Sequence, residues 1–369
     1  MEHTINFDIQ RQETFYEAII GNNIFESFGN ILKEKTNCKK ILVVTDKNIN
    51  NLYGERMKEV LEKSGYIYDF CVFKSGEEEK NFDNLKIILD KAFENKLERQ
   101  DCIVAFGGGV IGDMTGFAAS MYMRGINFVQ VPTTLLAQID SSIGGKTAVN
   151  TKYGKNLVGA FYQPKFVLSD ISFLKTLPKR ELKTGLGEAL KYAFIEKNCD
   201  EEKTELFDFL INNKENIFNL EDETMLSLVK RCVELKRNVV IKDEKENSLR
   251  MVLNFGHTIG HAIEKVTHYN VFTHGEAITI GMKAIFSIGL KEGKITREYF
   301  EQAENLLNLY EFDLKLPNNI NLDDLFHALI YDKKVRNSKV KLVPPVEKAA
   351  VEIFDNIDEK VIKEVLREI

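Results

Sequence analysis

The stretch CIVAFGGGVIGDMTGFAA, from Cys102 to Ala119, decides the fold class because a β-rich strand, a glycine loop and a helix follow one another directly. Residues 107–112 satisfy the pattern GxGxxG, in which bare backbone amides and a helix N-terminus can bind a pyrophosphate. Glycine is needed there because a β-carbon would block the approach of the phosphate. The usual dinucleotide fingerprint follows the first strand of its domain, whereas this loop follows roughly the third. Glycines that serve only a tight turn are therefore the alternative.

The segments around this loop alternate between strand and helix up to about Leu177. Apolar residues spaced by three and four, as in NFDNLKIILDKAFENKL, predict helices between short β-rich runs. The predicted strands are KKILVVTD, YIYDFCVF, DCIVAFGGG, INFVQVP and KFVLSD. This alternation predicts a Rossmann-like, mostly parallel sheet that helices cover on both faces.

The pattern becomes mainly helical after Pro178, and only KVKLVPP and AAVEIF near the end look extended. A proline favours extended backbone before it and a helix start after it, which makes this position a suitable boundary. We therefore predict an α/β domain over residues 1–177 and a mainly α-helical domain over residues 178–369. The active site is expected in the cleft between them.

Composition and charge exclude several classes of protein. The 369 residues are 44% hydrophobic and 29% charged, which is typical of a globular protein. A net charge of −6 attracts neither nucleic acid nor an anionic membrane. No apolar run is long enough to cross a bilayer, so we expect a cytoplasmic protein. The five cysteines form no CxxC pair and are expected to be structural thiols. An anionic substrate would need a local cluster of cations.

The segment SSIGGKTAVN invites comparison with a phosphate-binding Walker loop. The comparison fails because Asp140 stands five residues before Gly145, where GxxxxGKT requires glycine, and the preceding TTLLAQI is typical of a helix. Lys146 nevertheless lies in a polar, glycine-bearing stretch of the kind that often faces a cleft. The alternative is a solvated loop.

Four of the six histidines lie in LNFGHTIGHAIEKVTHYNVFTHGEA, residues 253–277. His257 and His261 are four apart, so on a helix their side chains share one face. The spacing resembles HExxH, but Thr258 stands where that motif has its general base, which excludes that type of metalloprotease. A catalytic metal commonly takes three protein ligands. The candidates for the third are His274, Glu276 and Glu188.

Charged residues also recur beside small or apolar neighbours. Glu188, which GLGEALKYAFI places at the opening of a helix, needs a partner because an unpaired buried charge is costly. That partner is either a metal ion or Lys191, three residues further on. The cations of this kind are Arg124, Lys146, Lys155, Lys191, Lys236, Arg250 and Lys341. They are either separate surface charges or, together, a pocket that binds carboxylate and phosphate.

The order of several motifs resembles that of the 3-dehydroquinate synthase family over almost the whole chain. These motifs are GGGVIGDMTGFAA, YMRGI, VPTTLLAQIDSSIGGKTAVN, GKNLVGAFYQP, FLKTLP, GEALKY, NFGHTIGHAIE and HGEAI. The resemblance implies a phosphate-eliminating lyase of the shikimate pathway, which makes 3-dehydroquinate from 3-deoxy-D-arabino-heptulosonate 7-phosphate for aromatic amino acid biosynthesis. It also implies bound NAD⁺, one divalent metal (zinc, with cobalt as the second option) and a homodimer.

The resemblance also implies a reaction sequence that explains these groups. The C5 hydroxyl is oxidised transiently, phosphate leaves, hydride returns and the opened ring closes by an internal aldol step, so the net reaction is not redox. The first domain would bind NAD⁺, and the second would bind the metal and the substrate. A metal would polarise and orient the C4 and C5 oxygens. Cations that hold both charged ends of the substrate would orient it, and the departing phosphate can serve as base.

Site residues follow from the same resemblance, position by position. The metal ligands would be Glu188, His257 and His274, so that His257 and His261 are not a ligand pair. Arg124 would reach in from a second subunit, and Lys339 competes with Lys341. The substrate and catalytic set would be Lys146, His261, Lys191, Asn254, Arg250, Asn156, Lys236, Arg124 and Lys341. The NAD⁺ set would be Asp46, Glu77, Lys80, Gly108, Gly109, Val110, Asp113, Thr133, Thr134, Asp140, Lys146, Lys155 and Thr176.

Three other functions fit parts of the sequence. Sister cyclases act on glucose 6-phosphate or a heptulose 7-phosphate and make 2-deoxy-scyllo-inosose or valiolone products. Metal-dependent polyol dehydrogenases share the architecture but transfer hydride to free cofactor, and a non-catalytic NAD-binding module is the third option. The presence of both Arg250 and Asn254 favours dehydroquinate synthesis, because these residues suit a substrate with a carboxylate.

Overall fold

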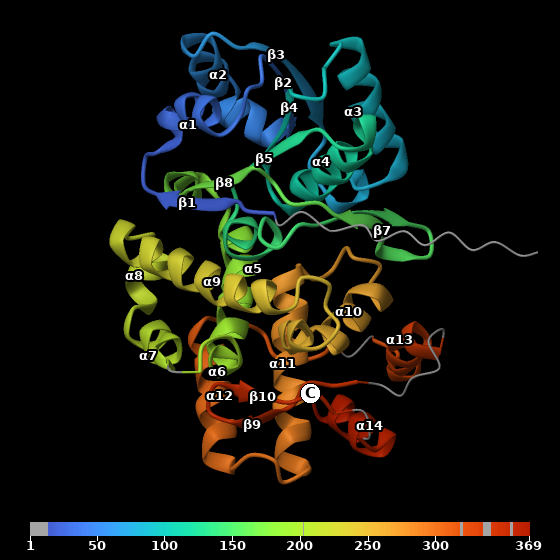
Figure 1. The fold of residues 1–369 in the computed structure, drawn as a ribbon. Helices are drawn as coiled ribbons and strands as arrows, with labels where there is room; N and C mark the ends of the chain where they lie inside the picture. Colours follow the sequence, from blue (N-terminus) through green and yellow to red (C-terminus); the bar gives the residue numbers. More distant parts are fainter. Residues whose placement is uncertain (1–13, 202, 318–319, 335–340, 355–356) are drawn as a thin grey trace, which may run out of the picture.

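A parallel six-stranded sheet forms the first half of the chain in the computed structural model, and a bundle of helices forms the second (Figure 1). The structure describes residues 14–201, 203–317, 320–334, 341–354 and 357–369. No helix among these residues combines the length and the apolar character that a bilayer crossing requires.

The strands of the sheet lie in the order β1-β8-β5-β4-β2-β3, and every neighbouring pair is parallel. Their bounds are β1 Glu17–Gly21, β2 Lys40–Asp46, β3 Ile67–Phe73, β4 Cys102–Gly107, β5 Asn127–Pro132 and β8 Phe166–Asp170. All five predicted strands are confirmed, and β1 is the strand that the sequence pattern did not reveal. The prediction of a Rossmann-like, mostly parallel sheet is thereby confirmed.

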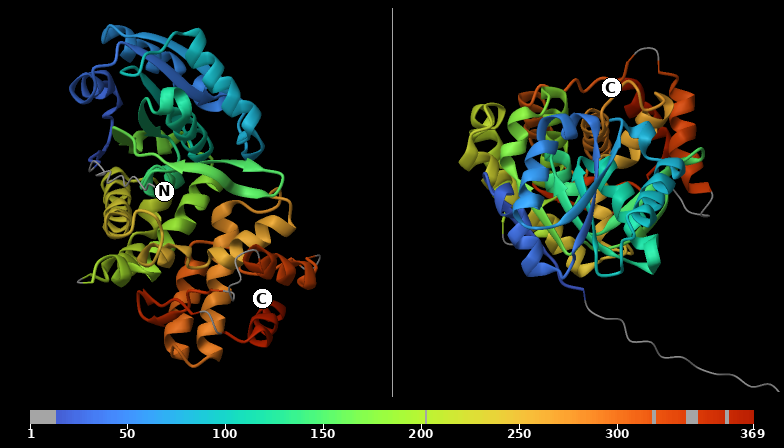
Figure 2. Two further views of the ribbon diagram at one scale, coloured as in Figure 1. Left: turned by 45° about the vertical axis from the view of Figure 1, so that its right-hand side comes forward. Right: turned by 90° about the horizontal axis from the view of Figure 1, so that it is seen from above.

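Helices cover both faces of this sheet because its strands are apolar on both sides. Leu42 and Val44 face one core with residues of α3 and α4, while Ile41 and Val43 face the other with residues of α1 and α2. The view from above shows the sheet between these helices (Figure 2). The helix bounds are α1 Phe28–Lys35, α2 Lys47–Lys63, α3 Phe82–Glu94 and α4 Gly109–Met121.

The carboxyl ends of the central strands locate the site. Counted from β2, the strand order is that of the flavodoxin-like doubly wound folds, whose ligands bind where the order reverses. Here the reversal falls between β2 and β4, which end at Asp46 and at the glycine loop. The position of that loop after the third predicted strand is therefore a suitable place for a nucleotide.

Two irregular features follow β5 on this side of the sheet. Residues Ala137–Ser141 form a short π-helix, η4, which is a rare conformation that occurs mostly at functional sites. Strands β6 (Lys146–Thr151) and β7 (Gly154–Phe161) then form an antiparallel hairpin. The alternative of a solvated loop at SSIGGKTAVN is thus wrong from Lys146 onward, because β6 pairs with β7 and buries Thr147, Ala148 and Val149.

The second half of the chain is mainly helical, as predicted, and its helices share one large core with η4 and β8. Its helices are α5 Lys179–Phe194, α6 Glu196–Cys199, α7 Glu205–Asn212, α8 Lys214–Phe218, α9 Asp222–Lys242, α10 His257–Val266, α11 His274–Lys291, α12 Arg297–Leu309, α13 Leu322–Lys334 and α14 Glu359–Glu368. The extended segments pair as β9 (Pro345–Glu347) with β10 (Ala350–Val351). The proposed boundary at 177/178 falls in the connection between β8 and α5.

Candidate active site

Three of the predicted metal ligands meet below the carboxyl edge of the sheet. Oε1 of Glu188 lies 3.1 Å from Nε2 of His257 and 3.0 Å from Nε2 of His274. The ligand atoms of these three residues lie within 4.8 Å of one another. One carboxylate and two imidazoles are the donor set of well-known catalytic zinc sites. The donor chemistry therefore fits zinc or cobalt.

Close packing of three helices brings these ligands together. A β-carbon at Gly187 of α5 would lie 2.8 Å from the Cα of Gly275 in α11, and one at Gly281 of α11 would lie 2.1 Å from the carbonyl oxygen of Gly256, which precedes α10. No side chain other than hydrogen fits at such distances. Glycine thus lets α5 and α10 contact α11 directly. The expectation that Glu188 opens a helix is wrong, because α5 begins nine residues earlier, at Lys179, after Pro178.

The charge on Glu188 is compensated although the residue is fully buried. Burial alone would raise its pKa, but the Lys191 ammonium and hydrogen bonds from His257 and His274 outweigh burial and hold the pKa well below its usual range. The pairing of Glu188 with Lys191 is present. It does not exclude a metal, because the other carboxylate oxygen faces the imidazoles.

His261 lies beside this cluster but outside the group centred on Glu188. Its ring centroid is 5.3 Å from that of His257 and 5.8 Å from that of His274, and the side chain is exposed. His261 instead shares a second possible metal-binding group with Glu264 and His274. The i, i+4 spacing of His257 and His261 therefore places two imidazoles together without making both of them partners of Glu188.

Asp140 connects the cluster to the sheet domain. Its Oδ1 accepts hydrogen bonds from the Tyr192 hydroxyl and the Lys236 ammonium, both at 2.8 Å, and lies 3.8 Å from Nζ of Lys191. The π-helix presents this carboxylate to α5 and α9. Burial lowers the pKa of Lys236 to about 8, although Asp140 opposes the shift.

A second group of cations meets at the segment that follows Asp140, residues 144–146. Arg250 is buried and donates to the carbonyl oxygen of Gly144 at 3.3 Å, while Lys146 pairs with Glu246. Asn254 donates to the same Glu246 carboxylate at 2.8 Å. Lys191 therefore contacts the cluster directly and Lys236 is linked to it through Asp140, while Lys146, Arg250 and Asn254 meet around Gly144 and Glu246.

Glu246 is a residue of this site that the sequence did not suggest. It lies in KDEKENSLR, whose run of charges is indistinguishable from a solvated loop. Asp243 shapes that loop by accepting hydrogen bonds from the backbone of Asn247, Ser248 and Arg250, at 2.8 to 3.0 Å. No local signal identifies Glu246, because its partner Lys146 lies 100 residues away.

The glycine loop lies at the other side of Asp140. No glycine in residues 107–112 takes a positive φ, which argues against the tight-turn alternative. A β-carbon at Gly109 would lie 2.9 Å from Oγ of Ser141, and one at Gly108 would lie 3.2 Å from Thr134. No side chain caps the first turn of α4. Its N–H groups are therefore available to a phosphate.

The remaining candidates for nucleotide binding surround this loop. Lys80 donates hydrogen bonds to both Asp113 and Asn156, which brings Asn156, predicted to contact the substrate, next to two residues predicted to bind NAD⁺. The Thr133 hydroxyl is buried without a hydrogen bond to the described residues. Asp46 caps α2, and Thr176 bonds Tyr53 of the same helix. Val110 lies in the first turn of α4. Glu77 and Lys155 lie 3.9 Å apart.

Two predicted residues stand apart from the cluster. Within the described part of the chain, Arg124 makes no hydrogen bond or ion pair with the other candidates, and its backbone has a positive φ of 65°. Lys341 is exposed at the start of the segment that pairs Leu342 with Phe354. Lys339 lies outside the described residues.

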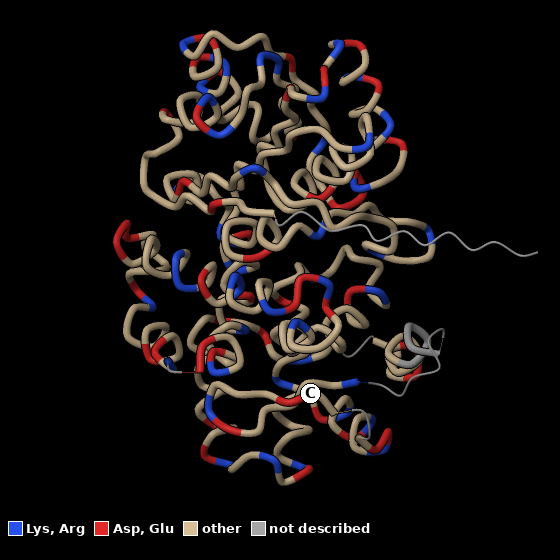
Figure 3. The backbone as a smooth tube through the Cα atoms, in the orientation of Figure 1, with Lys and Arg blue, Asp and Glu red and all other residues tan. Residues whose placement is uncertain are grey.

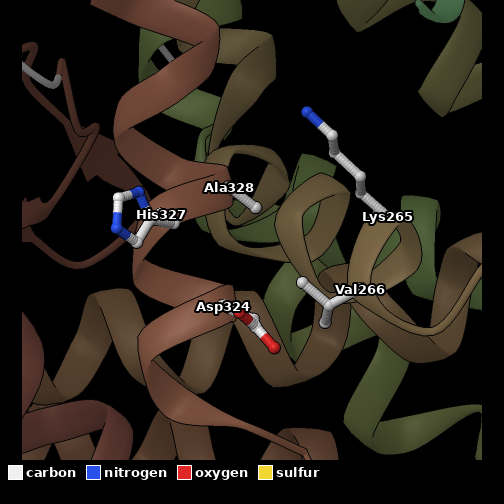
Figure 4. A pocket seen from close by; sticks show the side chains of 5 residues that line it. All are labelled: Lys265, Val266, Asp324, His327 and Ala328. Carbon is white, nitrogen blue, oxygen red and sulfur yellow. The ribbon is translucent and has the colours of Figure 1, made fainter.

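Neither of two surface hollows in the described structure coincides with the cluster. One, of about 240 Å³, lies between α10 and α13 and is lined by Lys265, Val266, Asp324, His327 and Ala328 (Figure 4). The other, of about 320 Å³, lies against α12 and β9. Charges of both signs are spread along the chain (Figure 3).

Comparison with known proteins gives the same picture. The family model described as 3-dehydroquinate synthase N-terminal matches residues 70–184, and the model described as 3-dehydroquinate synthase C-terminal matches residues 185–335. The chain is 43% identical over 344 residues to the 3-dehydroquinate synthase of Alkaliphilus metalliredigens (strain QYMF), which covers 93% of each chain.

Solved structures of related cyclases also superimpose on the chain. The 2-epi-5-epi-valiolone synthase ValA of Streptomyces hygroscopicus subsp. jinggangensis 5008, with NAD⁺ and Zn²⁺ bound, has a TM-score of 0.89 at 25% identity and covers 98% of each chain. A 2-deoxy-scyllo-inosose synthase complexed with carbaglucose-6-phosphate, NAD⁺ and Co²⁺ has a TM-score of 0.84 at 29% identity, over 95% of this chain and 96% of that one. Since both family models match in succession and the curated relative aligns over nearly the full length, the chain belongs to the 3-dehydroquinate synthase family.

Proposed function

We propose that the protein converts 3-deoxy-D-arabino-heptulosonate 7-phosphate into 3-dehydroquinate and phosphate. The observation that carries this proposal is the pairing of Lys191 with Glu188 and of Lys236 with Asp140, with Arg250 bonded to Gly144 close behind Asp140 in the chain, in a member of this family. A substrate with a phosphate at one end and a carboxylate at the other needs cations in two places, because each anion must be compensated on leaving water.

Two groups that the site would bind supply the chemistry. The glycine loop would hold NAD⁺, which would supply the hydride acceptor and donor for the transient oxidation at C5. Glu188, His257 and His274 would hold a divalent ion, zinc or cobalt, which would supply Lewis-acid polarisation of substrate oxygens. The rest of the catalysis is orientation and charge compensation by the side chains of the protein.

The side chains around the cluster have distinct tasks in this proposal. Arg250 and Asn254 bind the carboxylate end, and the lysines compensate the phosphate, which is the leaving group and can itself accept the C6 proton. Asp140 holds Lys236 at 2.8 Å and so fixes its ammonium in place. His261, exposed beside His257, contacts the substrate. Orientation of this kind accounts for a large part of a catalysed rate.

We also propose a cytoplasmic homodimer in which Arg124 reaches the active site of the partner. The exposed apolar side chains of Met121 and Met123 flank Arg124, which suits a contact surface. All five cysteines are buried free thiols, as expected in a reducing compartment.

Release of inorganic phosphate from the heptulosonate phosphate tests the proposed reaction. Phosphate should appear together with 3-dehydroquinate, without net formation of NADH, and a chelator should abolish it. Phosphate release from glucose 6-phosphate or a heptulose 7-phosphate, but not from the heptulosonate, would instead identify a sister cyclase. Steady formation of NADH with a polyol would identify a dehydrogenase.

A further inference from the structure

Glu264 is a buried carboxylate beside the metal cluster that the proposed reaction does not use. It lies in the last turns of α10 and is only 3% exposed. Its two oxygens point to different partners: Oε2 lies 3.6 Å from Nδ1 of His274, and Oε1 lies 3.2 Å from Nζ of Lys155. A carboxylate buried this deeply destabilises the fold unless its charge is paired, so its partners indicate its role.

The two nitrogens of His274 face two different carboxylates. Nε2 is directed at Glu188, 3.0 Å away, while Nδ1 is directed at Glu264. An imidazole that binds a metal through Nε2 must carry its proton on Nδ1, and that N–H needs an acceptor to fix the tautomer and the ring orientation. Within the described residues, Glu264 is the group placed to accept it.

We infer that Glu264 is a positioning residue for the metal centre: it accepts the Nδ1–H of His274 and holds the ring with Nε2 toward Glu188 and His257. This inference rests on the proposed function, because it assumes that His274 is a ligand. Lys155 of β7 compensates the charge of Glu264 and stacks on the Tyr269 ring, 4.2 Å from its centroid. Since β7 belongs to the sheet half of the chain, this contact also joins the two halves at the metal centre.

A second metal ion is the competing explanation for the same residues. His261, Glu264 and His274 have ligand atoms within 4.8 Å of one another. Such an ion would have to share His274 with the first site, through both ring nitrogens, and to displace Lys155 from Glu264. The ion pair between Glu264 and Lys155 favours the positioning role.

Glu264→Gln in the full-length chain tests the inference, because the amide keeps the shape of the side chain and removes its charge. Zinc affinity measured by competition with a chelator should fall about 10- to 100-fold, which is the usual effect of losing a hydrogen-bond partner of a metal ligand. The cobalt-loaded variant should show an altered visible absorption spectrum, and the NMR signal of the His274 Nδ1 proton in the zinc-loaded protein should shift or disappear.

Glu276→Gln is the matched control. Glu276 lies two residues from His274 but bonds Arg180 at 2.8 Å and caps α11, a role that glutamine retains. Its zinc affinity and cobalt spectrum should equal those of the unmodified chain.

Two results would overturn the inference. One is an unchanged zinc affinity and cobalt spectrum in Glu264→Gln; the other is a second zinc equivalent in the unmodified chain that this variant loses. Neither result resembles a failure of the proposed function, in which the unmodified chain would release no phosphate from the heptulosonate phosphate.

Discussion

Glu188 and His274 lie 86 residues apart and on different helices, yet Oε1 of the carboxylate and Nε2 of the imidazole are 3.0 Å apart. Removing both polar groups from water costs free energy, which their contacts must compensate. A shared metal ion would compensate this cost, because both atoms would then be its ligands.

Replacing Glu188 should remove the metal without unfolding the chain. In Glu188→Gln, the buried side chain keeps its volume but loses its charge. Zinc affinity should fall by more than about 100-fold, because loss of a residue that only hydrogen-bonds to a ligand already costs up to about that much. Zinc content after gel filtration and the circular dichroism spectrum check this. Full zinc content in a folded variant would remove Glu188 from the ligand set.

The rate should depend on pH through Lys236. Burial lowers its pKa to about 8, so its ammonium is present below that pH and is lost as the pH rises through it. Because the cation attracts an anionic substrate, kcat/KM should decline above about pH 8. In Lys236→Arg the charge persists, and the alkaline decline should vanish. If kcat/KM declines with the same midpoint pH in both proteins, a group other than Lys236 causes the decline.

Mixed dimers can test the proposed role of Arg124. A dimer of one Arg124→Ala subunit and one His257→Ala subunit has one complete site if Arg124 acts across the interface. In a symmetric dimer mixed at equal amounts, about a quarter of the unmodified activity should return. If mass spectrometry shows that the subunits have exchanged but no activity returns, Arg124 does not act in the partner's site.

Gly281→Ala should destabilise the protein although alanine normally favours a helix by about 1 kcal/mol. Its β-carbon would lie 2.1 Å from the carbonyl oxygen of Gly256, so α10 and α11 must separate. Overpacking of this kind costs about 1–3 kcal/mol, and the melting temperature should fall accordingly. Gly54→Ala in α2 is the control, because its β-carbon would meet only the flexible end of Asn50. Equal melting temperatures for both variants would contradict the steric argument.

The sequence predicts the sheet domain well because its five predicted strands are rich in β-branched and aromatic residues. β1 was missed since EAIIG is short and begins with a charge. The β6–β7 hairpin was missed since β7 is largely exposed and KTAVNT of β6 contains only two apolar residues. These segments become strands through tertiary contacts and not through their own pattern.

For the site, the resemblance to a known family predicts the residues, and the structure shows which residues they contact. Asp140 could be named from a motif, but its contacts with Tyr192 and Lys236 span 52 and 96 residues. The ion pairs of Glu246 with Lys146 and of Glu264 with Lys155 span 100 and 109 residues. Pairings at such separations leave no trace in local composition, so they could not be predicted.

The glycine contacts between α5, α10 and α11 have a consequence for the choice of ion. Because these helices touch through backbone atoms, no change of side-chain rotamer can alter the distances between them. The helices themselves therefore set the distances between the three ligand residues. Zinc accepts nitrogen and oxygen at about 2.0–2.2 Å, whereas calcium requires about 2.3–2.6 Å and more oxygen donors. The centre should therefore discriminate by ionic radius, admitting cobalt in place of zinc and rejecting calcium even at a large excess.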